Sequence, residues 1–160
     1  MASDIHIKIG DVKGESLDDK HKGEIEVLSW SWGAVQQGTM AMGGGAGAGK
    51  VSFHDFNFQH TVDKASPVLW QACASGKHYP DATLTVRKAG KDQQEYLIIK
   101  WKEVFVTSVS SNGTGEGGAT MESVSLQGNK VELEYKPQKA DGSLDAGVFF
   151  KYDVKANKSY

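Results

Sequence analysis

The sequence has few of the residues that mark disulfide-stabilised, exported or membrane-spanning proteins. Cys73 is the single cysteine among 160 residues, so no internal disulfide can form and a disulfide scaffold is excluded. No apolar run approaches the roughly 20 residues that a membrane helix needs. Residues 1–8 contain neither a basic nor an apolar stretch of the kind found in signal peptides, so we expect none.

An excess of charge of one sign is also missing. The formal net charge is −2, from 18 Lys and Arg against 20 Asp and Glu. Nucleic-acid-binding proteins usually carry a basic excess, so we expect no nucleic-acid partner. The chain is long enough for one core and shows no repeat or linker, so we predict a single domain over residues 1–160.

Glycine, by contrast, is abundant between residues 38 and 50. Gly44, Gly49 and Lys50 match part of a Walker A loop, but Val51 stands where a hydroxyl residue would hold magnesium. The aromatic-rich residues after Val51 indicate a strand, so no helix N-terminus is available for a phosphate. We therefore predict a long, flexible excursion between two strands, which contacts another molecule.

A second glycine pattern, at residues 113–118, matches G-x-G-x-x-G literally. A dinucleotide fingerprint must open a helix inside a βαβ unit. Here residues 121–126 alternate in the manner of a strand, which favours a simple strand connection. A nucleotide-dependent enzyme remains an alternative that binding of ATP or NAD would reveal.

The rest of the chain is dominated by strand patterns. Apolar residues alternate with polar ones at Ile5, Ile7 and Ile9, and from Tyr96 to Val109 the odd positions are expected to face one way. The apolar parity shifts within residues 24–35 and 51–60, which suggests bulges or a change of sheet. Further strands are expected at residues 82–89, at 121–135 with a break at Gly128, and at 148–154 after an Asp141-Gly142 turn.

One helix interrupts the strands. Ser66 is a suitable N-cap, Pro67 a suitable first residue and Gly76 a suitable end. Cys73 falls on its apolar face and is expected to be a small buried residue. The fold class is therefore all-β: a β-barrel of two packed sheets with one flanking α-helix.

Residues for catalysis or metal binding are scarce. His54 and His60 lie about 20 Å apart along a strand, too far for one metal site. His6, His21 and His78 lack ligand spacing and are expected to be isolated surface imidazoles. Glu24 and Glu26 share a strand face, where a solvated or ion-paired surface is the favoured interpretation over acid–base chemistry.

The tryptophans are the remaining candidates for binding. Trp30, Trp32, Trp70 and Trp101 could form a platform for sugar stacking. Their positions in the strand and helix alternation place them mostly on the same faces as other apolar residues, which favours burial of the tryptophans in the core. A β-barrel glycan-binding module is kept as the alternative function.

Eight segments spread along the chain carry a resemblance to a known family: residues 9–16 (IGDVKGES), 19–25 (DKHKGEI), 27–33 (VLSWSWG), 43–50 (GGGAGAGK), 62–67 (VDKASP), 74–80 (ASGKHYP), 85–90 (TVRKAG) and 135–143 (YKPQKADGS). Taken in order, they resemble the Hcp family, the haemolysin-coregulated tube proteins of the bacterial type VI secretion system. The resemblance covers essentially the whole chain. One departure is Gly128, near which the family usually places an apolar or aromatic residue.

The resemblance implies a structural protein that is not an enzyme and has no cofactor or metal. Family members form homohexameric rings that stack into the inner tube of a contractile machine and hold effector proteins in the ring lumen. A sheath surrounds the tube and a VgrG-type spike protein sits at its tip. The protein would assemble in the cytoplasm and then be secreted without a signal peptide, serving virulence, with no membrane partner.

Two groups of residues are assigned to this function. The glycine-rich segment is predicted to make the contacts between stacked rings. Leu28, Trp30 and Trp32 are expected to point into the core, so Ser29 and Ser31 would face the lumen and its cargo. The predicted ring-stacking residues are Thr39, Met40, Met42, Gly43, Gly44, Gly45, Gly47, Gly49 and Lys50.

Overall fold

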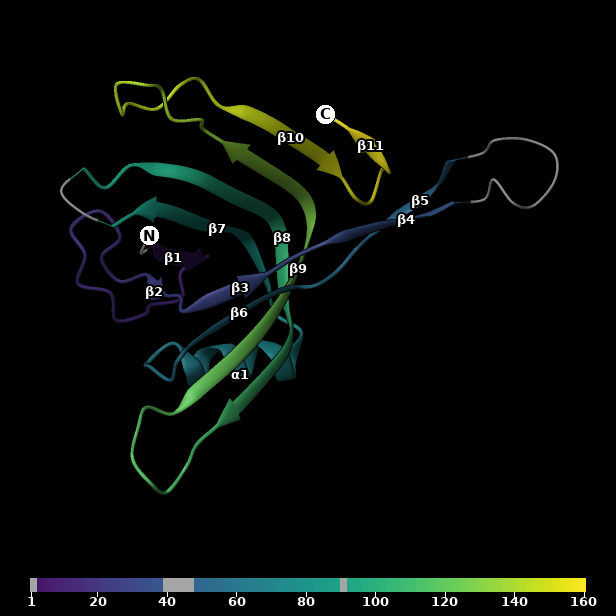
Figure 1. Cartoon of the computed structure of the whole chain (residues 1–160). Coiled ribbons are helices and arrows are strands. Elements are labelled where there is room, and N and C mark those ends of the chain that lie inside the picture. Colours follow the sequence, from purple (N-terminus) through teal and green to yellow (C-terminus); the bar gives the residue numbers. More distant parts are fainter. Residues whose placement is uncertain (1–2, 39–47, 90–91) are drawn as a thin grey trace.

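The computed structural model describes residues 3–38, 48–89 and 92–160, which form strands and one helix (Figure 1). Most of these elements are strands, because alternating apolar residues allow a strand to bury one face in the core. The elements are β1 (Ser3–Ile9), β2 (Ile25–Glu26), β3 (Ser29–Ser31), β4 (Ala34–Gly38), β5 (Ala48–Phe53), β6 (Phe56–Thr61), α1 (Ser66–Ser75), β7 (His78–Lys88), β8 (Glu95–Asn112), β9 (Met121–Tyr135), β10 (Val148–Asp153) and β11 (Lys158–Ser159).

Nine of these strands form one curved sheet in the order β11-β10-β9-β8-β7-β1-β2, with β6 pairing both β9 and β3. The chain closes this sheet between β2 and β3. The Val27 N–H donates to Ile5 O in β1, and the next N–H, of Leu28, donates to Gln59 O in β6. The predicted all-β fold with a flanking helix is thereby confirmed.

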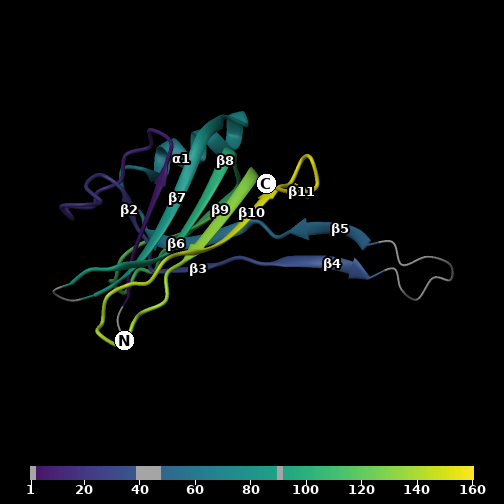
Figure 2. The same ribbon diagram turned by 90° about the horizontal axis from the view of Figure 1, so that it is seen from above.

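The remaining two strands, β4 and β5, pair antiparallel in a sheet of their own. This β4–β5 ribbon projects from the barrel, as the view from above shows (Figure 2). The predicted strand over residues 24–35 is therefore three short strands, and that over 51–60 is parts of two. The parity shifts in the sequence mark the points where the chain changes partner strand.

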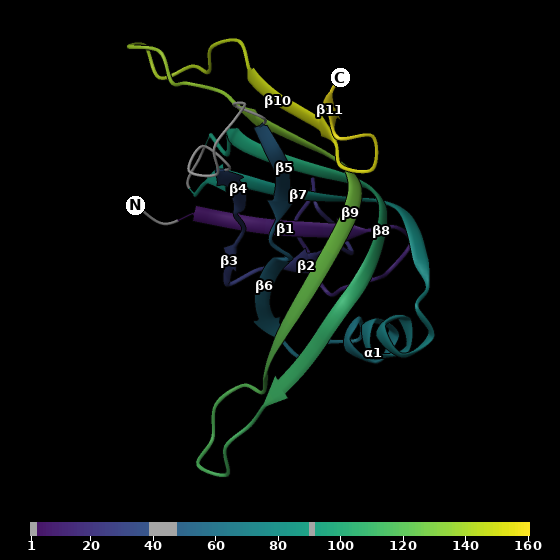
Figure 3. The same cartoon turned by 90° about the vertical axis from the view of Figure 1, so that its right-hand side faces the viewer.

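The long strands β8 and β9 curve around the barrel (Figure 3). Trp101 and Val104 are both buried, so the inward face changes parity between them, and Glu103 there has a φ of 54°. The expectation that odd positions face one way throughout is thus wrong between Trp101 and Val109, where a register shift after Val106 restores the odd positions to the core. Val104 and Val106 are buried instead of Phe105, which is half-buried.

Gly128 lies on β9 at the same bend, and the strand runs through it without the predicted break. A Cβ atom built on Gly128 would lie 2.7 Å from the Cβ of Trp101. Glycine therefore does not leave a gap at this position, because the tryptophan fills the space.

We expect the substitution Gly128→Ala to lower the free energy of unfolding by about 1–3 kcal/mol, the usual cost of overpacking. The Trp101 Cβ is fixed to the backbone and cannot move aside cheaply. Gly115→Ala is the control, since a Cβ there meets nothing within 4 Å. Urea unfolding of both variants checks this, and equal stability of Gly128→Ala and the parent would contradict the packing argument.

The helix α1 contacts β8 and buries Leu69 and Ala72, with Cys73 partly buried beside the core. Gly76 ends it in a left-handed conformation at φ 69°, as predicted. The cap lies one residue earlier than predicted, at Ala65, which makes no side-chain cap bond. The Ser66 hydroxyl instead accepts a hydrogen bond from the Asp63 N–H.

The barrel interior is filled by apolar side chains of β1, β6, β7, β8 and β9, with Trp101 among the largest that are fully buried. Trp30 and Trp32 pack against this core, as predicted. Leu28 is an exception, because 58% of it is exposed. The Leu28 N–H donates to Gln59 of β6, whereas the preceding Val27 N–H donates to β1. The chain changes partner strand between these two residues, so Leu28 does not continue the inward alternation of Trp30 and Trp32.

Candidate assembly and cargo surfaces

The candidate cargo surface is the outer face of β3, β6, β9 and β8. Register places Ser31, Asn57, Ser125 and Ser108 in one row across these strands. A second row, two residues along, contains Ser29, Gln59, Ser123 and Ser110. We name these residues the polar face. Each of them is uncharged and carries a hydroxyl or an amide.

The polar face is set by strand alternation. Between its two rows lies a row of apolar residues that point into the barrel: Trp30, Phe58, Val124 and Val109. Ser29 and Ser31 are exposed, as predicted from their alternation with Trp30. Their cross-strand neighbours were missed, because register between distant strands is not visible in the sequence.

Hydrogen bonds hold part of the polar face in place. The Asn57 side-chain amide donates to both Ser123 Oγ and Ser125 Oγ, each at 2.9 Å. This arrangement links β6 to β9 through side chains as well as through the backbone ladder. The face is thus a fixed polar wall with exposed hydroxyls at its β3 end.

The candidate stacking surface is the β4–β5 ribbon. Gly49 and Lys50 lie in β5, and Lys50 is exposed. The other residues predicted for ring stacking lie outside the described residues: Thr39, Met40, Met42, Gly43, Gly44, Gly45 and Gly47. The described part of the ribbon, β4 and β5, extends away from the barrel (Figure 2).

An aromatic cluster anchors the base of the ribbon. The Phe53 ring lies 5.8 Å from Trp32 and 5.7 Å from Tyr152 between centroids. Trp32 in turn meets Trp101 edge-on at 5.6 Å, and Phe150 lies 6.2 Å from Phe53. Such aromatic pairs are each worth about 0.5–1.5 kcal/mol beyond area burial, so the cluster fixes the ribbon on the barrel.

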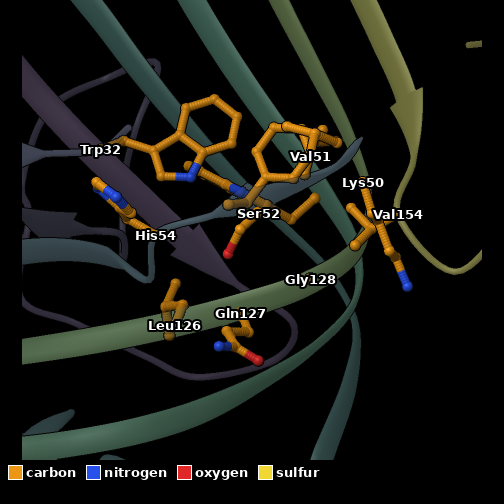
Figure 4. Close-up of a pocket in the computed structure, with 12 residues that line it drawn as sticks. Trp32, Lys50, Val51, Ser52, His54, Leu126, Gln127, Gly128 and Val154 are labelled. Carbon is orange, nitrogen blue, oxygen red and sulfur yellow. The ribbon is translucent and has the colours of Figure 1, made fainter. Parts of the chain in front are cut away.

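Two cavities flank this base. One, of about 400 Å³, separates Trp32, Val51 and His54 from Leu126 and Gln127 of β9 (Figure 4). The other, of about 390 Å³, lies toward β10 and is lined mainly by apolar side chains, among them Phe150 and Tyr152. On β10, Val148 and Phe149 are also exposed. The ribbon thus rests on aromatic contacts with open space on both sides.

Three histidines are buried, and two of them, His6 and His21, contradict the expectation of surface imidazoles. His6, His21 and His60 are 1%, 6% and 0% exposed. His60 Nε2 lies 2.8 Å from Glu122 Oε1 and its Nδ1 3.8 Å from Asp63 Oδ2. Carboxylate partners compensate for the burial of His21 and His60, but Glu95 and Glu122 are far away in the sequence, so spacing did not reveal them. His78 is exposed, as expected, and so is His54.

The pKa of His60 follows from this setting. Burial alone lowers the pKa of the imidazole, but the hydrogen bond to Glu122 and the negative charges of Asp63 and Glu122 together outweigh it. The net pKa of His60 is raised above the usual 6.5. Glu122 also accepts hydrogen bonds from Trp70 Nε1 and Ser111 Oγ, both at 3.0 Å. The pair therefore connects β6, β9, β8 and α1.

A sugar-stacking platform is not formed by the tryptophans. Trp101 is buried, while Trp30 and Trp32 pack partly buried against the core. Trp70 is 49% exposed, contrary to the expectation that it lies in the core, because its indole N–H reaches Glu122 from the helix surface. A single exposed ring does not make a platform.

The remaining sequence candidates have structural roles. Residues 113–120 connect β8 to β9, and no helix follows them, so the dinucleotide hypothesis fails on geometry. Glu24 is bonded to His21, while Glu26 is exposed on β2. Among residues 3–38, 48–89 and 92–160, no cluster of three His, Cys, Asp or Glu side chains could hold a metal ion.

Comparison with known proteins decides the family. A family model described as type VI secretion system effector, Hcp, matches residues 6–135. The chain belongs to the Hcp family. Protein hcp1 of Pseudomonas aeruginosa is 54% identical over 159 residues, covering 98% of each chain.

Solved structures of Hcp proteins have the same fold as this chain. A structure described as a type six secretion system protein aligns with a TM-score of 0.92 at 32% identity, covering 99% of this chain and 100% of that chain. Hcp1 from Salmonella typhimurium aligns with a TM-score of 0.81 at 41% identity, with the same coverage. The chain therefore has an Hcp fold.

In the part of the chain that the structure describes, no helix has the length and apolarity needed to cross a membrane. The polar face and the β4–β5 ribbon are the surfaces from which a function can be argued.

Proposed function

We propose that this Hcp-family chain, as one domain over residues 1–160, is the tube subunit of a type VI secretion system. Six copies form a ring, rings stack into a tube, and effector proteins travel in the ring lumen. The observation that carries the proposal is the polar face, an uncharged wall that spans four strands of the barrel.

The composition of the polar face suits a lumen. A ring built from barrels needs one sheet to line its central hole, and this face has no large apolar side chain that would demand burial. Exposed hydroxyls at Ser29 and Ser31 offer weak hydrogen bonds to varied cargo. Repetition around the ring would add these weak contacts together by multivalency.

The ring itself requires a head-to-tail contact between different surfaces of neighbouring copies. Such a contact closes into a ring when its rotation divides a circle. The chain carries 18 basic and 20 acidic residues, so complementary patches on opposite flanks are available. We place the contacts between rings at the β4–β5 ribbon and residues 39–47.

The other partners follow from this role. Sheath proteins would surround the tube, a VgrG-type spike would meet its end, and effectors would occupy its interior. The chain would assemble in the cytoplasm and leave the cell through the machine itself. The polar face would therefore meet cargo, while other outer surfaces would meet the sheath.

We expect the substitution Ser31→Gln to reduce effector retention and to leave ring size unchanged. The longer side chain would crowd the exposed hydroxyls of the polar face without entering the barrel. The measurement is the amount of effector that co-purifies with rings, together with ring mass by light scattering. Ser75→Gln is the control, because Ser75 is exposed at the end of α1 and away from the polar face.

Two outcomes would count against this assignment. A broken ring in the Ser31→Gln variant would place Ser31 in the contact between subunits. Unchanged retention of effector would remove the polar face from the lumen. Because the polar face is uncharged, retention by the parent should also change little between low and high salt.

A further inference from the structure

Two buried imidazoles lie stacked on each other beneath the segment that joins β1 to β2. The rings of His6 and His21 are 4.7 Å apart between centroids and 7° from parallel. His6 belongs to β1, and His21 to residues 11–24, which we call the latch segment. This segment lies at the end of the molecule away from the β4–β5 ribbon (Figures 1 and 2).

His21 holds the latch segment to the barrel. Its Nδ1 lies 2.9 Å from Glu24 Oε2 and its Nε2 2.9 Å from Glu95 Oε1. Through its two ring nitrogens, His21 thus joins the latch segment to the start of β8.

His6 has the opposite environment. Both of its ring nitrogens are buried and have no hydrogen-bond partner among the described residues. Across the strands it pairs in register with Glu26 of β2 and with Thr85 of β7, which is buried. Burial, above all, lowers the pKa of His6, so the neutral ring is favoured in the folded state.

The charged groups around His6 make a positive charge on its ring unfavourable. Arg87, fully buried on β7, and His21 both oppose a proton on His6, while Asp4 and Glu24 favour one. Asp4 is already ion-paired with Arg87 at 2.6 Å, and Glu24 is bonded to His21. Arg87 is also paired with Asp18 of the latch segment, so positive charge here is already balanced by the carboxylates present.

We propose that the stacked His6–His21 pair is an acid-sensitive latch, which holds residues 11–24 against β1, β7 and β8 at neutral pH and releases them when His6 takes up a proton. A positive charge on His6 would be buried without a hydrogen-bond acceptor and beside Arg87, and moving the latch segment away exposes the ring to water. The latch rests on contacts within one chain and does not depend on the proposed tube function.

The sign of the pH dependence follows from linkage. An unfolded or released His6 has a pKa near 6.5, and the docked His6 has a lower one. The docked state is therefore fully favoured above about pH 6.5 and loses stability as the pH falls below that value. Because opening takes up one proton, the equilibrium constant for opening rises by at most about tenfold for each unit by which the pH falls.

Amide hydrogen exchange by NMR, from pH 7.5 to pH 5, tests the latch on the full chain. The reporters are Gly14 N–H, bonded to Gly23 O, and Ser16 N–H, bonded to Glu24 O. After correction for intrinsic exchange, their protection should fall several-fold from pH 6.5 to pH 5. Protection of Ile99, buried on β8, should stay constant. Joint loss at all three sites would mean global acid unfolding and would overturn the proposal, as would unchanged protection at Gly14 and Ser16.

Variants separate the latch from general instability. His6→Phe keeps a ring on His21 without a titrating nitrogen, so the pH dependence at Gly14 and Ser16 should disappear. His6→Gln provides a second uncharged side chain if the phenylalanine variant does not fold. His78→Phe is the control, since His78 is exposed and stacks on Phe105 at 5.2 Å. A full pH dependence in a folded His6 variant would exclude His6 as the trigger.

Discussion

Shortening residues 40–47 is expected to leave rings intact and to abolish tube formation and secretion. The thirteen residues from Gly38 to Lys50, half going out and half returning, reach roughly 20 Å when extended. A domain of this length has a radius of gyration of about 15 Å, so we expect this segment to cross to a neighbouring ring. The β4–β5 ribbon that flanks residues 39–47 projects away from the barrel (Figure 2).

The composition of the segment supports the same expectation. Glycines allow backbone conformations closed to other residues, and Met40 and Met42 offer adaptable apolar contacts. Electron microscopy of the purified variant checks for rings and tubes. The matched control shortens the glycine-rich connection at residues 113–120, which lies at a different extremity (Figure 3). Normal tubes from the 40–47 variant would refute the stacking role.

Replacing Glu122 with leucine is expected to destabilise the barrel by about 3–5 kcal/mol, the cost of breaking a buried ion pair. The side chains of His60 and Glu122 are 1% and 0% exposed. Without Glu122, the His60 imidazole and the Trp70 indole lose hydrogen-bond acceptors. The melting temperature should fall by roughly 6–20 °C, at about 2–4 °C per kcal/mol for a chain of this size.

The effect of Glu122→Leu should depend on pH with a defined sign. Because the folded pKa of His60 is raised, its charged form contributes stability that is fully present below about pH 6.5 and is lost as the pH rises through the folded pKa. The difference in stability between parent and variant should therefore be larger at pH 6 than at pH 9.

Denaturant titrations at both pH values measure this difference. Glu116→Gln is the control, since Glu116 is exposed in the connection between β8 and β9. A loss of unfolding free energy below about 1 kcal/mol at pH 6 for Glu122→Leu would contradict this expectation, because conservative exchanges of buried side chains cost about this much. The His60–Glu122 ion pair would then add little stability beyond the packing of its side chains.

Local patterns in the sequence predicted the elements well where one face of a strand is buried throughout. Ile5, Ile7 and Ile9 alternate within β1, and Pro67 and Gly76 mark the two ends of α1 to within a residue. The parity shifts near Leu28 and Phe53 marked real changes of partner strand. The sequence did not show that Leu28 is exposed, because that depends on where the chain leaves its pairing with β1 and begins to pair with β6.

Hydrogen-bond and cross-strand partners that are distant along the chain could not be predicted from the sequence. His21 is bonded to Glu95 and His60 to Glu122, 74 and 62 residues apart, so their burial could not be seen from spacing. For the same reason Ser31 was found on the exposed face while its row partners Asn57 and Ser125 were missed. Gly128 looked like a weakness in β9 because its neighbour Trp101 lies on another strand.

The mass of the purified protein in solution tests the ring most directly. The protomer is 17.3 kDa, and light scattering after gel filtration should give about six times this value at micromolar concentration. Negative-stain images of the same peak should show a ring with an open centre. A stable monomer of 17.3 kDa from micromolar to millimolar concentration would contradict the account.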